Sequence, residues 1–308
     1  MTSVALFEIK CVSVIIPNLN SPILDQVLAA LYSQQLEPEV YVEIIVVGQD
    51  TSGCLQRFPE VVFEYTERPV GPAVARNIGI GRARGQLIAY LDADCVPDPM
   101  WVSAMIAAHR AHPDRAIIGG SIKIDAENIW TLADNLSNFH AYLPTRQAAV
   151  YRVLPTCNLS IKRDVIDQVG LFDESFLINE DVDWTMRARQ KGFSLYFCPA
   201  AQVWHRTQRG TARAVWQHAM LWGYYSIVNR HRYSNLEPLS FVLRHWLTLV
   251  VLSPMIAISV TAGIFVRNPA ILKSIYTFPV ILGAKLAWCW GAAKRLKQRE
   301  KNSHVGSC

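Results

Sequence analysis

The chain has 308 residues, of which 51% are hydrophobic and 18% charged, and its mean hydropathy is +0.16. This composition excludes an intrinsically disordered protein, which needs low hydrophobicity and high net charge. The net charge of +5 is unevenly spread, because residues 241–308 hold nine Lys or Arg against one acid and the first 240 residues therefore carry −3. A nucleic-acid-binding surface is not indicated, since its basic excess would lie on the folded domain.

The cysteines and the N-terminal residues bear on the compartment. Seven cysteines are widely spaced and never form a Cys-x-x-Cys pair, which argues against a disulfide framework and a zinc cluster. Residues 1–17 lack the basic segment, long apolar run and small-residue cleavage site of a signal peptide. We therefore expect a reducing compartment and an N-terminal domain that stays in the cytoplasm.

Residues 11–205 alternate short β-branched runs with helical stretches. The helical stretches are residues 23–35 and 72–84, the second following a Gly-Pro start. The runs indicate strands buried on both faces of a parallel sheet, at residues 12–17, 42–47, 61–65 and 86–91. This alternation predicts an α/β sandwich. Ligands of open sheets bind beyond the carboxyl ends of the strands, where polar residues follow the runs here: Asn18, Asn20, Gln49, Asp50, Asp92 and Asp94.

The segment YLDADCVPDP, residues 90–99, carries the strongest local signal. Asp92 and Asp94 are two residues apart at the end of an apolar run, so their carboxylates point to the same side. Such a pair can share a hard cation, which can offset the charge of a diphosphate. A structural alternative is that the two acids cap the following helix, predicted over residues 97–112.

Downstream, three acids precede a predicted helix that ends in basic residues. Capping of that helix explains Asp183 better than it explains Glu180 and Asp181. A carboxylate beside a bound diphosphate can instead accept a proton from an attacking hydroxyl as a general base. His205 follows another short apolar run, and it is either structural or a further metal ligand, imidazole suiting Mn²⁺ better than Mg²⁺.

The C-terminal region is apolar and basic. Residues 245–266 contain no formal charge, and residues 275–293 contain only Lys285, followed by a basic cluster from Lys294 onward. About 20 apolar residues span a bilayer core as a helix, so the two runs predict a helical membrane hairpin with both ends cytoplasmic. Whether the helices span or lie in the membrane stays open, and core helices of a soluble domain are the alternative.

Five blocks between Val12 and His205 together resemble family 2 glycosyltransferases of the inverting GT-A type. They occur in the family's order: VSVIIPNLN, EIIVVGQDTSG, GPAVARNIGIGRARGQLIAYLDADCVPDPMW, TCNLSIKRDVIDQVGLFDESFLINEDVDW and RQKGFSLYFCPAAQVWH. The resemblance implies a GT-A three-layer sandwich over residues 1–240, followed by a membrane-associated helical hairpin with a basic tail over residues 241–308.

The resemblance also implies roles for individual residues. Asp181 is similar to the family's catalytic base, with Glu180 beside it. Asp94 and His205 match metal ligands, and Asp92 matches the acid on the nucleotide side that also contributes to the metal site. The expected cofactor is Mn²⁺ or Mg²⁺. The remaining expected nucleotide contacts are Pro17, Asn18, Asn20, Gln49 and Arg76.

Two departures from the family pattern affect the choice of nucleotide. Leu19 stands where many members have an aromatic residue, and Gly48-Gln49-Asp50-Thr51 replaces Asp-Asp-Gly-Ser. UDP remains the first expectation, because Gln49 can still hydrogen-bond a base edge, with GDP and dTDP open. The expected activity is transfer of a single sugar to a lipid-linked or glycan acceptor at the inner membrane, with the catalytic domain facing the cytoplasm. A nucleotidyltransferase and a catalytically inactive, membrane-anchored sugar-binding protein are the alternatives.

Overall fold

The chain forms two compact units in a computed structural model that describes residues 8–305, with side chains described as far as Lys301. The first unit contains the residues up to Lys123 together with Tyr142–His205. The second contains residues 124–141 and the residues from Arg206 onward. Residues 124–141 are thus an insertion in the sheet unit that packs with the C-terminal helices.

The first unit is built on a mixed sheet with the strand order β3-β2-β1-β4-β8-β6-β9-β5, and β7 pairs with β9. Strands β1 to β4 pair in parallel, whereas β8 pairs antiparallel with β4 and β6, and β9 antiparallel with β5 and β7. The strands are β1 Cys11–Leu19, β2 Tyr41–Gln49, β3 Val62–Tyr65, β4 Leu87–Leu91, β5 Cys95–Pro97, β6 Ile117–Ile124, β7 Ala149–Tyr151, β8 Asn158–Lys162 and β9 Leu195–His205.

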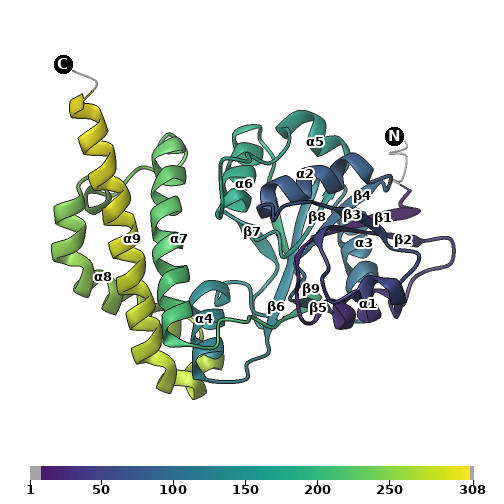
Figure 1. Cartoon of the computed structure of the whole chain (residues 1–308), viewed down its shortest axis with the longest axis horizontal. Helices are drawn as coiled ribbons and strands as arrows, with labels where there is room; N and C mark the ends of the chain where they lie inside the picture. The colour runs from purple at the N-terminus through teal and green to yellow at the C-terminus, as the bar shows by residue number, and fades with distance from the viewer. Residues whose placement is uncertain (1–7, 306–308) are drawn as a thin grey trace. The chain divides into compact units, whose positions relative to one another are not determined.

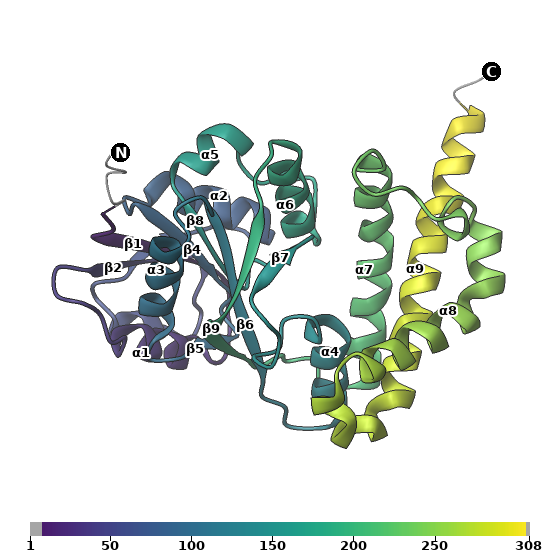
Figure 2. The same ribbon diagram turned by 180° about the vertical axis from the view of Figure 1, so that it is seen from behind.

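Helices cover both faces of this sheet, which gives the three layers expected from the sequence (Figures 1 and 2). One face carries α2, α5 and α6, and the opposite face carries α1 and α3. Their bounds are α1 Leu24–Tyr32, α2 Pro72–Arg82, α3 Trp101–Ala111, α5 Asp164–Val169 and α6 Glu180–Gln190, with a short 3₁₀ turn at Cys54–Arg57.

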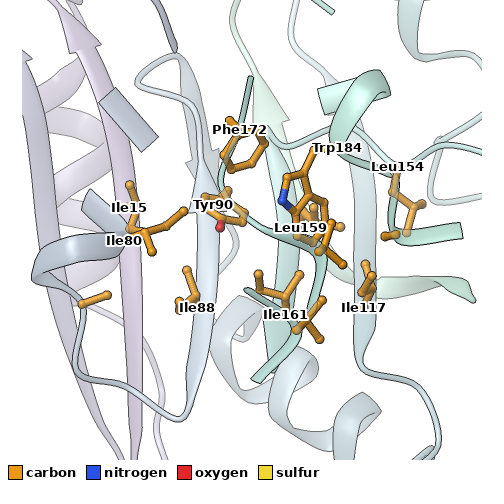
Figure 3. Packing of buried hydrophobic residues seen from close by; sticks show 14 of the residues in the cluster. Ile15, Ile80, Ile88, Tyr90, Ile117, Leu154, Leu159, Ile161, Phe172 and Trp184 are labelled. Carbon is orange, nitrogen blue, oxygen red and sulfur yellow. The ribbon is translucent and has the colours of Figure 1, made fainter. Parts of the chain in front are cut away.

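The core under α2, α5 and α6 contains three aromatic side chains in contact (Figure 3). Phe172 stacks on Trp184 with ring centroids 5.6 Å apart and meets Tyr90 edge-on at 5.4 Å. Tyr90 lies on β4, two residues before Asp92, and Trp184 lies on the first turns of α6. This packing therefore fixes the end of β4 against the beginning of α6, where the predicted site residues lie.

The four predicted strands and two predicted helices are present, with ends shifted by a few residues. Two local predictions were wrong. Residues 62–65 are not buried on both faces, because β3 is the edge strand and exposes alternate side chains. Helix α3 begins at Trp101 rather than at residue 97, because Pro97 belongs to the short strand β5. The sheet is also not parallel throughout, since its second half is antiparallel.

The second unit is helical, and α9 lies at its centre. Helix α9 packs against α7, α8 and α4. The elements are α4 Ile129–Phe139, α7 Ala212–Arg232, α8 Trp246–Val266 and α9 Phe278–Val305, with 3₁₀ segments η2 Phe241–Leu243 and η3 Pro269–Thr277. By length and composition, α8 and the segment Pro269–Lys301 could cross a membrane. The functional boundary at residue 240 stays a prediction, and by packing α7 belongs to this second unit.

Two glycines bring the backbones of α7 and α9 together. A Cβ added to Gly223 on α7 would lie 1.9 Å from the carbonyl oxygen of Trp288, and one on Gly291 of α9 would lie 1.9 Å from that of Met220. Any larger side chain would separate the helices, as at other helix crossings built on small residues. The crossing therefore fixes α7 alongside α9.

We expect Gly291→Ala to lower the free energy of unfolding of the helical unit by about 1–3 kcal/mol, because the added methyl group forces the two helices apart. Gly283→Ala is the matched control on the same helix, where a Cβ meets nothing within 4 Å. There the replacement should be neutral or stabilising by up to about 1 kcal/mol, from helix propensity alone. Denaturant unfolding followed by circular dichroism, with both variants in the same detergent, measures the two free energies of unfolding. Equal values for the two variants would contradict the close approach of α7 and α9 at Gly291.

Candidate functional site

The predicted acid pair lies in a tight turn between β4 and β5. The N–H of Cys95 donates to the carbonyl of Asp92 at 3.0 Å, which closes the turn. The Ser21 hydroxyl, just beyond β1, donates to the carbonyl of Ala93 at 2.6 Å. The turn is therefore attached to the end of a neighbouring strand, and the carboxylates of Asp92 and Asp94 start from a rigid backbone.

Three possible metal ligands converge at this turn. The Nε2 atom of His205 lies 3.6 Å from Oδ2 of Asp94, and the Sγ atom of Cys95 lies 3.8 Å from Oδ1 of the same residue. Cys95 and His205 are directly opposite each other in the β5–β9 register, and the ligand atoms of all three residues lie within 4.8 Å of one another. A carboxylate and an imidazole this close form a donor set that fits Mn²⁺.

Cys95 was missed in the sequence analysis, although its place next to Asp94 was a usable signal. Its thiol is buried, and burial raises its pKa well above the ordinary value. A soft thiol ligand suits Zn²⁺ better than Mg²⁺. Asp92, predicted as a contributor to the metal site, is not part of this cluster, and its role at a metal stays a prediction.

Arg76 joins two elements of the site. The guanidinium lies on α2 with 2% of the residue exposed, and its Nη2 atom donates to Oδ1 of Asp92 at 2.8 Å. Its Nη1 atom donates to Oε1 of Glu180, the first residue of α6. The Nε atom of Arg76 is buried and has no hydrogen-bond partner among the described residues. Arg76 therefore bridges the end of β4 and the beginning of α6.

Asp181 lies beside this ion pair at the beginning of α6. The residue before the helix, Asn179, has a left-handed backbone with φ of 67°, which turns the chain sharply into Glu180 and Asp181. The carboxylate of Asp181 accepts the N–H of Val182 at 2.8 Å. Its pKa is raised to about 7, first by burial and then by the charge of Glu180, although Arg76 opposes the shift.

The neighbouring charges respond to the same environment. Burial also raises the pKa of Asp92, against the attraction of Arg76. Burial lowers the pKa of Arg76, but the charges of Glu180 and Asp92 outweigh it and leave the pKa above its ordinary value. A carboxylate with a pKa near neutrality can accept a proton and release it again at physiological pH.

The predicted nucleotide contacts at the ends of β1 and β2 mostly hold the protein together. Asn18 donates to the carbonyl of Gln49 at 2.6 Å and accepts the N–H of Ser21 at 3.0 Å. Asn20 accepts the N–H of Thr51 at 2.8 Å, and the Gln49 amide donates to the carbonyl of Thr66 at 3.2 Å. Pro17 pairs with Val47 in the strand register. Their roles toward a nucleotide stay predictions.

The arrangement of sheet and helices defines a class of protein, those with the GT-A fold. S. aureus TarS 1-349, solved in complex with UDP, superposes with a TM-score of 0.52 at 14% identity, over 94% of this chain and 91% of that one. GalNAc-T7, solved with UDP, GalNAc and Mn²⁺, superposes with a TM-score of 0.53 at 17% identity, over 76% of this chain and 52% of that one. At these identities the likeness establishes the fold.

The sequence places the chain within that class. The sequence model of glycosyl transferase family 2 matches residues 13–170, and the chain belongs to this family. The glycosyltransferase AglE of Haloferax volcanii is 29% identical over 194 residues, a match that covers 60% of this chain and 64% of AglE. The match thus spans less than two thirds of that relative. The family and fold predicted from the sequence are confirmed.

We expect Arg76→Met to lower the free energy of unfolding by about 3–5 kcal/mol, because it leaves the buried carboxylate of Glu180 and that of Asp92 without their cation. Arg82→Met on the same helix is the control, since Arg82 pairs with Glu64 at the surface and such pairs contribute about 0–1 kcal/mol. Denaturant unfolding of both variants tests this. A loss in Arg76→Met no larger than in Arg82→Met would show that the bridge does not support the fold.

Proposed function

We propose that the protein transfers a single sugar, with inversion, from a nucleotide-diphospho-sugar to a hydroxyl of a lipid-linked or glycan acceptor at the membrane. The observation that carries this proposal is the meeting of two groups within the first unit. One group is the metal-ligand cluster of Asp94 and His205. The other is Arg76 with Asp92, Glu180 and the raised-pKa carboxylate of Asp181.

The donor's diphosphate fits the first group. A divalent cation held by Asp94 and His205, with Asp92 beside it, would stabilise the negative charge that develops on the departing nucleoside diphosphate. Arg76, whose Nη2 atom donates to Asp92, would add positive charge close to the bound diphosphate. UDP is the first choice of nucleotide, which agrees with the UDP bound in both solved neighbours.

The second group acts on the acceptor. Asp181 is proposed to accept the proton of the attacking hydroxyl while the new glycosidic bond forms on the opposite side from the leaving diphosphate. Glu180, bound to Arg76, acts through Asp181, because its negative charge helps to raise the pKa of that neighbour. Attack from the opposite side inverts the anomeric carbon. One carboxylate is enough for this displacement, since no covalent glycosyl intermediate is needed.

The apolar C-terminal helices support an acceptor at the membrane. The long helix α8 has a mean hydropathy of 2.3, and only 33% of its apolar window is buried inside the protein. Helices with this much exposed apolar surface fit a membrane environment. We propose the inner membrane, with the catalytic unit facing the cytoplasm, because the anionic cytoplasmic leaflet attracts basic residues such as those that surround the apolar runs.

Replacement of a metal ligand tests the cation. Asp94→Asn should weaken Mn²⁺ binding at least about tenfold. Replacing a residue that only hydrogen-bonds to a metal ligand already lowers metal affinity about 10–100-fold, and Asp94 is proposed as a direct ligand. Asp98→Asn is the control, since Asp98 pairs with Lys123 at 3.3 Å outside the cluster. Isothermal titration with Mn²⁺ and UDP measures both. Removal of the cation by EDTA should abolish turnover, and unchanged affinity in Asp94→Asn would refute the assignment.

Replacement of the proposed base, Asp181, should lower kcat strongly. Asp181→Asn keeps the shape of the side chain but cannot accept the proton, so kcat should fall about 10²- to 10⁴-fold. UDP affinity should stay within about twofold and serves as the internal control. The measurement is turnover with a matched donor and acceptor, and the configuration of the product is read by NMR. Near-normal turnover, or a product that keeps the donor's anomeric configuration, would exclude this mechanism.

The pH profile offers an independent test of the same group. Because the base must be ionised, kcat/KM should fall about tenfold per pH unit below a pKa of about 7 and level off above it. Glu180→Gln removes a charge that raises this pKa, so the acidic limb should move to lower pH. The residual activity of Asp181→Asn should lack the limb. A limb that persists unchanged in Asp181→Asn would assign it to another group.

A further inference from the structure

The insertion α4 is attached to the middle of the predicted membrane hairpin. The ammonium group of Lys285, on α9, donates to the carbonyl of Ser137, on α4, at 2.9 Å. Lys285 lies seven residues into α9, about 10 Å from its beginning at 1.5 Å per residue. The connection from α8 to α9, residues 267–277, is therefore close to α4. Helix α4 also packs against η3.

Two ion pairs, one just before α4 and one on the helix itself, keep α4 out of hydrocarbon. Arg206 pairs with Asp125 at 2.7 Å, and Arg209 pairs with Asp134 at 2.7 Å. If the hairpin crossed a bilayer with its connection on the far side, α4 and both ion pairs would have to enter the hydrocarbon to reach Lys285. Each charge at the centre of a bilayer costs about 2.5–3.5 kcal/mol on insertion scales.

Helix α7 likewise argues against a membrane-spanning position for the rest of α9. It follows α9 from the contact of Trp216 with Trp290, whose ring centroids are 5.4 Å apart, to the hydrogen bond from Tyr224 to Gln298 at 2.8 Å. Among the described helices, α7 is not one of the two that are apolar enough to span a membrane. Its last turn contains Arg230, His231 and Arg232. A bilayer-spanning α9 would carry this polar helix into the lipid.

Helix α8, by contrast, exposes most of its apolar surface. Its buried residues Leu249, Ser253, Ala257 and Thr261 recur every fourth position, which forms one narrow stripe. Ile264 and Phe265 near its end are buried as well. Other apolar side chains of α8 are open, among them Val251, which is 67% exposed, and Met255, which is 70% exposed. The exposed large apolar residues of α8 and η3, which we call the α8 face, are Leu247, Val250, Val251, Met255, Ile258, Val260, Val266, Leu272, Ile275 and Tyr276.

The charge around the α8 face selects its partner. Arg244 precedes α8, Arg267 and Lys273 follow it, and all three are exposed. The sequence contains no acidic residue from position 238 to position 299. A large apolar surface with basic residues at both ends matches the boundary between the headgroups and acyl chains of an anionic bilayer, which takes up helices lying flat.

We propose that the C-terminal unit binds one leaflet of an anionic bilayer through the α8 face and does not cross it. Residues 267–277 and the C-terminal end of α9 then stay on the same side of the membrane as the sheet. The proposal rests on the proposed function only in that both place the protein at a membrane. It also decides between the spanning and lying arrangements that the sequence left open.

Cysteine labelling in sealed membrane vesicles tests the topology of the full-length protein. In a background with Cys54, Cys198 and Cys308 replaced by Ser, single cysteines are introduced by Lys273→Cys, Lys301→Cys and, as a marker on the sheet unit, Ser33→Cys. A membrane-impermeant maleimide should label all three from the same side. Labelling of Lys273→Cys only from the other side, or only after the membrane is dissolved, would overturn the proposal.

Vesicle binding tests the α8 face itself. Val251→Glu combined with Met255→Glu should lower sedimentation with phosphatidylglycerol-containing vesicles about tenfold or more. Tyr41→Glu is the control, because Tyr41 is 58% exposed at the amino end of β2. Unchanged vesicle binding of the double variant would overturn the proposal. So would a dimeric wild-type protein if the double variant is monomeric and still binds vesicles as well as the wild type. Release of UDP from a UDP-sugar in detergent is measured in parallel, and its absence counts against the proposed function alone.

Discussion

The buried ion pairs of Arg76 are the interaction on which the arrangement of the site depends. Two segments far apart in the sequence, the end of β4 and the beginning of α6, supply the carboxylates that surround one guanidinium. A buried cation of this kind is stable only when its partners are in place, because unpaired burial costs several kcal/mol. The centroid of the Phe172 ring lies 5.7 Å from the guanidinium carbon and covers the same side chain. Packing of this part of the core therefore also brings the end of β4 and the beginning of α6 together at the site.

The sequence was enough to predict the first half of the sheet and to select residues that the structure brings close together, such as Asp94 and His205. Strands such as residues 12–17 and 42–47 are short runs that are apolar apart from Ser13 and Glu43, which favours burial on both faces. Polar and acidic residues directly after such runs indicate the carboxyl ends of the strands. The five glycosyltransferase-like blocks then suggested the roles of Asp94, Asp181 and His205, which stay predictions. The strands could be predicted because their signal is local: an apolar run and the residues that follow it.

Features that depend on partners distant in the sequence could not be predicted in the same way. The bridge from Arg76 to Glu180 joins residues 104 positions apart, and no periodicity within α2 reveals that its arginine turns inward. Cys95 becomes a candidate ligand only through its register with His205 across β5 and β9. The attachment of α4 to α9 also could not be predicted from the local sequence. The hydropathy of an apolar helix is the same whether the helix lies in lipid or packs against other helices.

The charges of the site favour the proposed divalent cation. Asp92, Asp94, Glu180 and Asp181 are four carboxylates, and Arg76 is the one guanidinium that binds two of them. Fully ionised, these five residues carry a net charge of −3, which repels the diphosphate of a nucleotide sugar. The raised pKa values of Asp92 and Asp181 reflect the same excess of negative charge together with burial. A divalent cation held by Asp94 and His205 would reverse the sign of this interaction. Asp181 is not part of that cluster, so it would keep the raised pKa that the proposed general base needs at neutral pH.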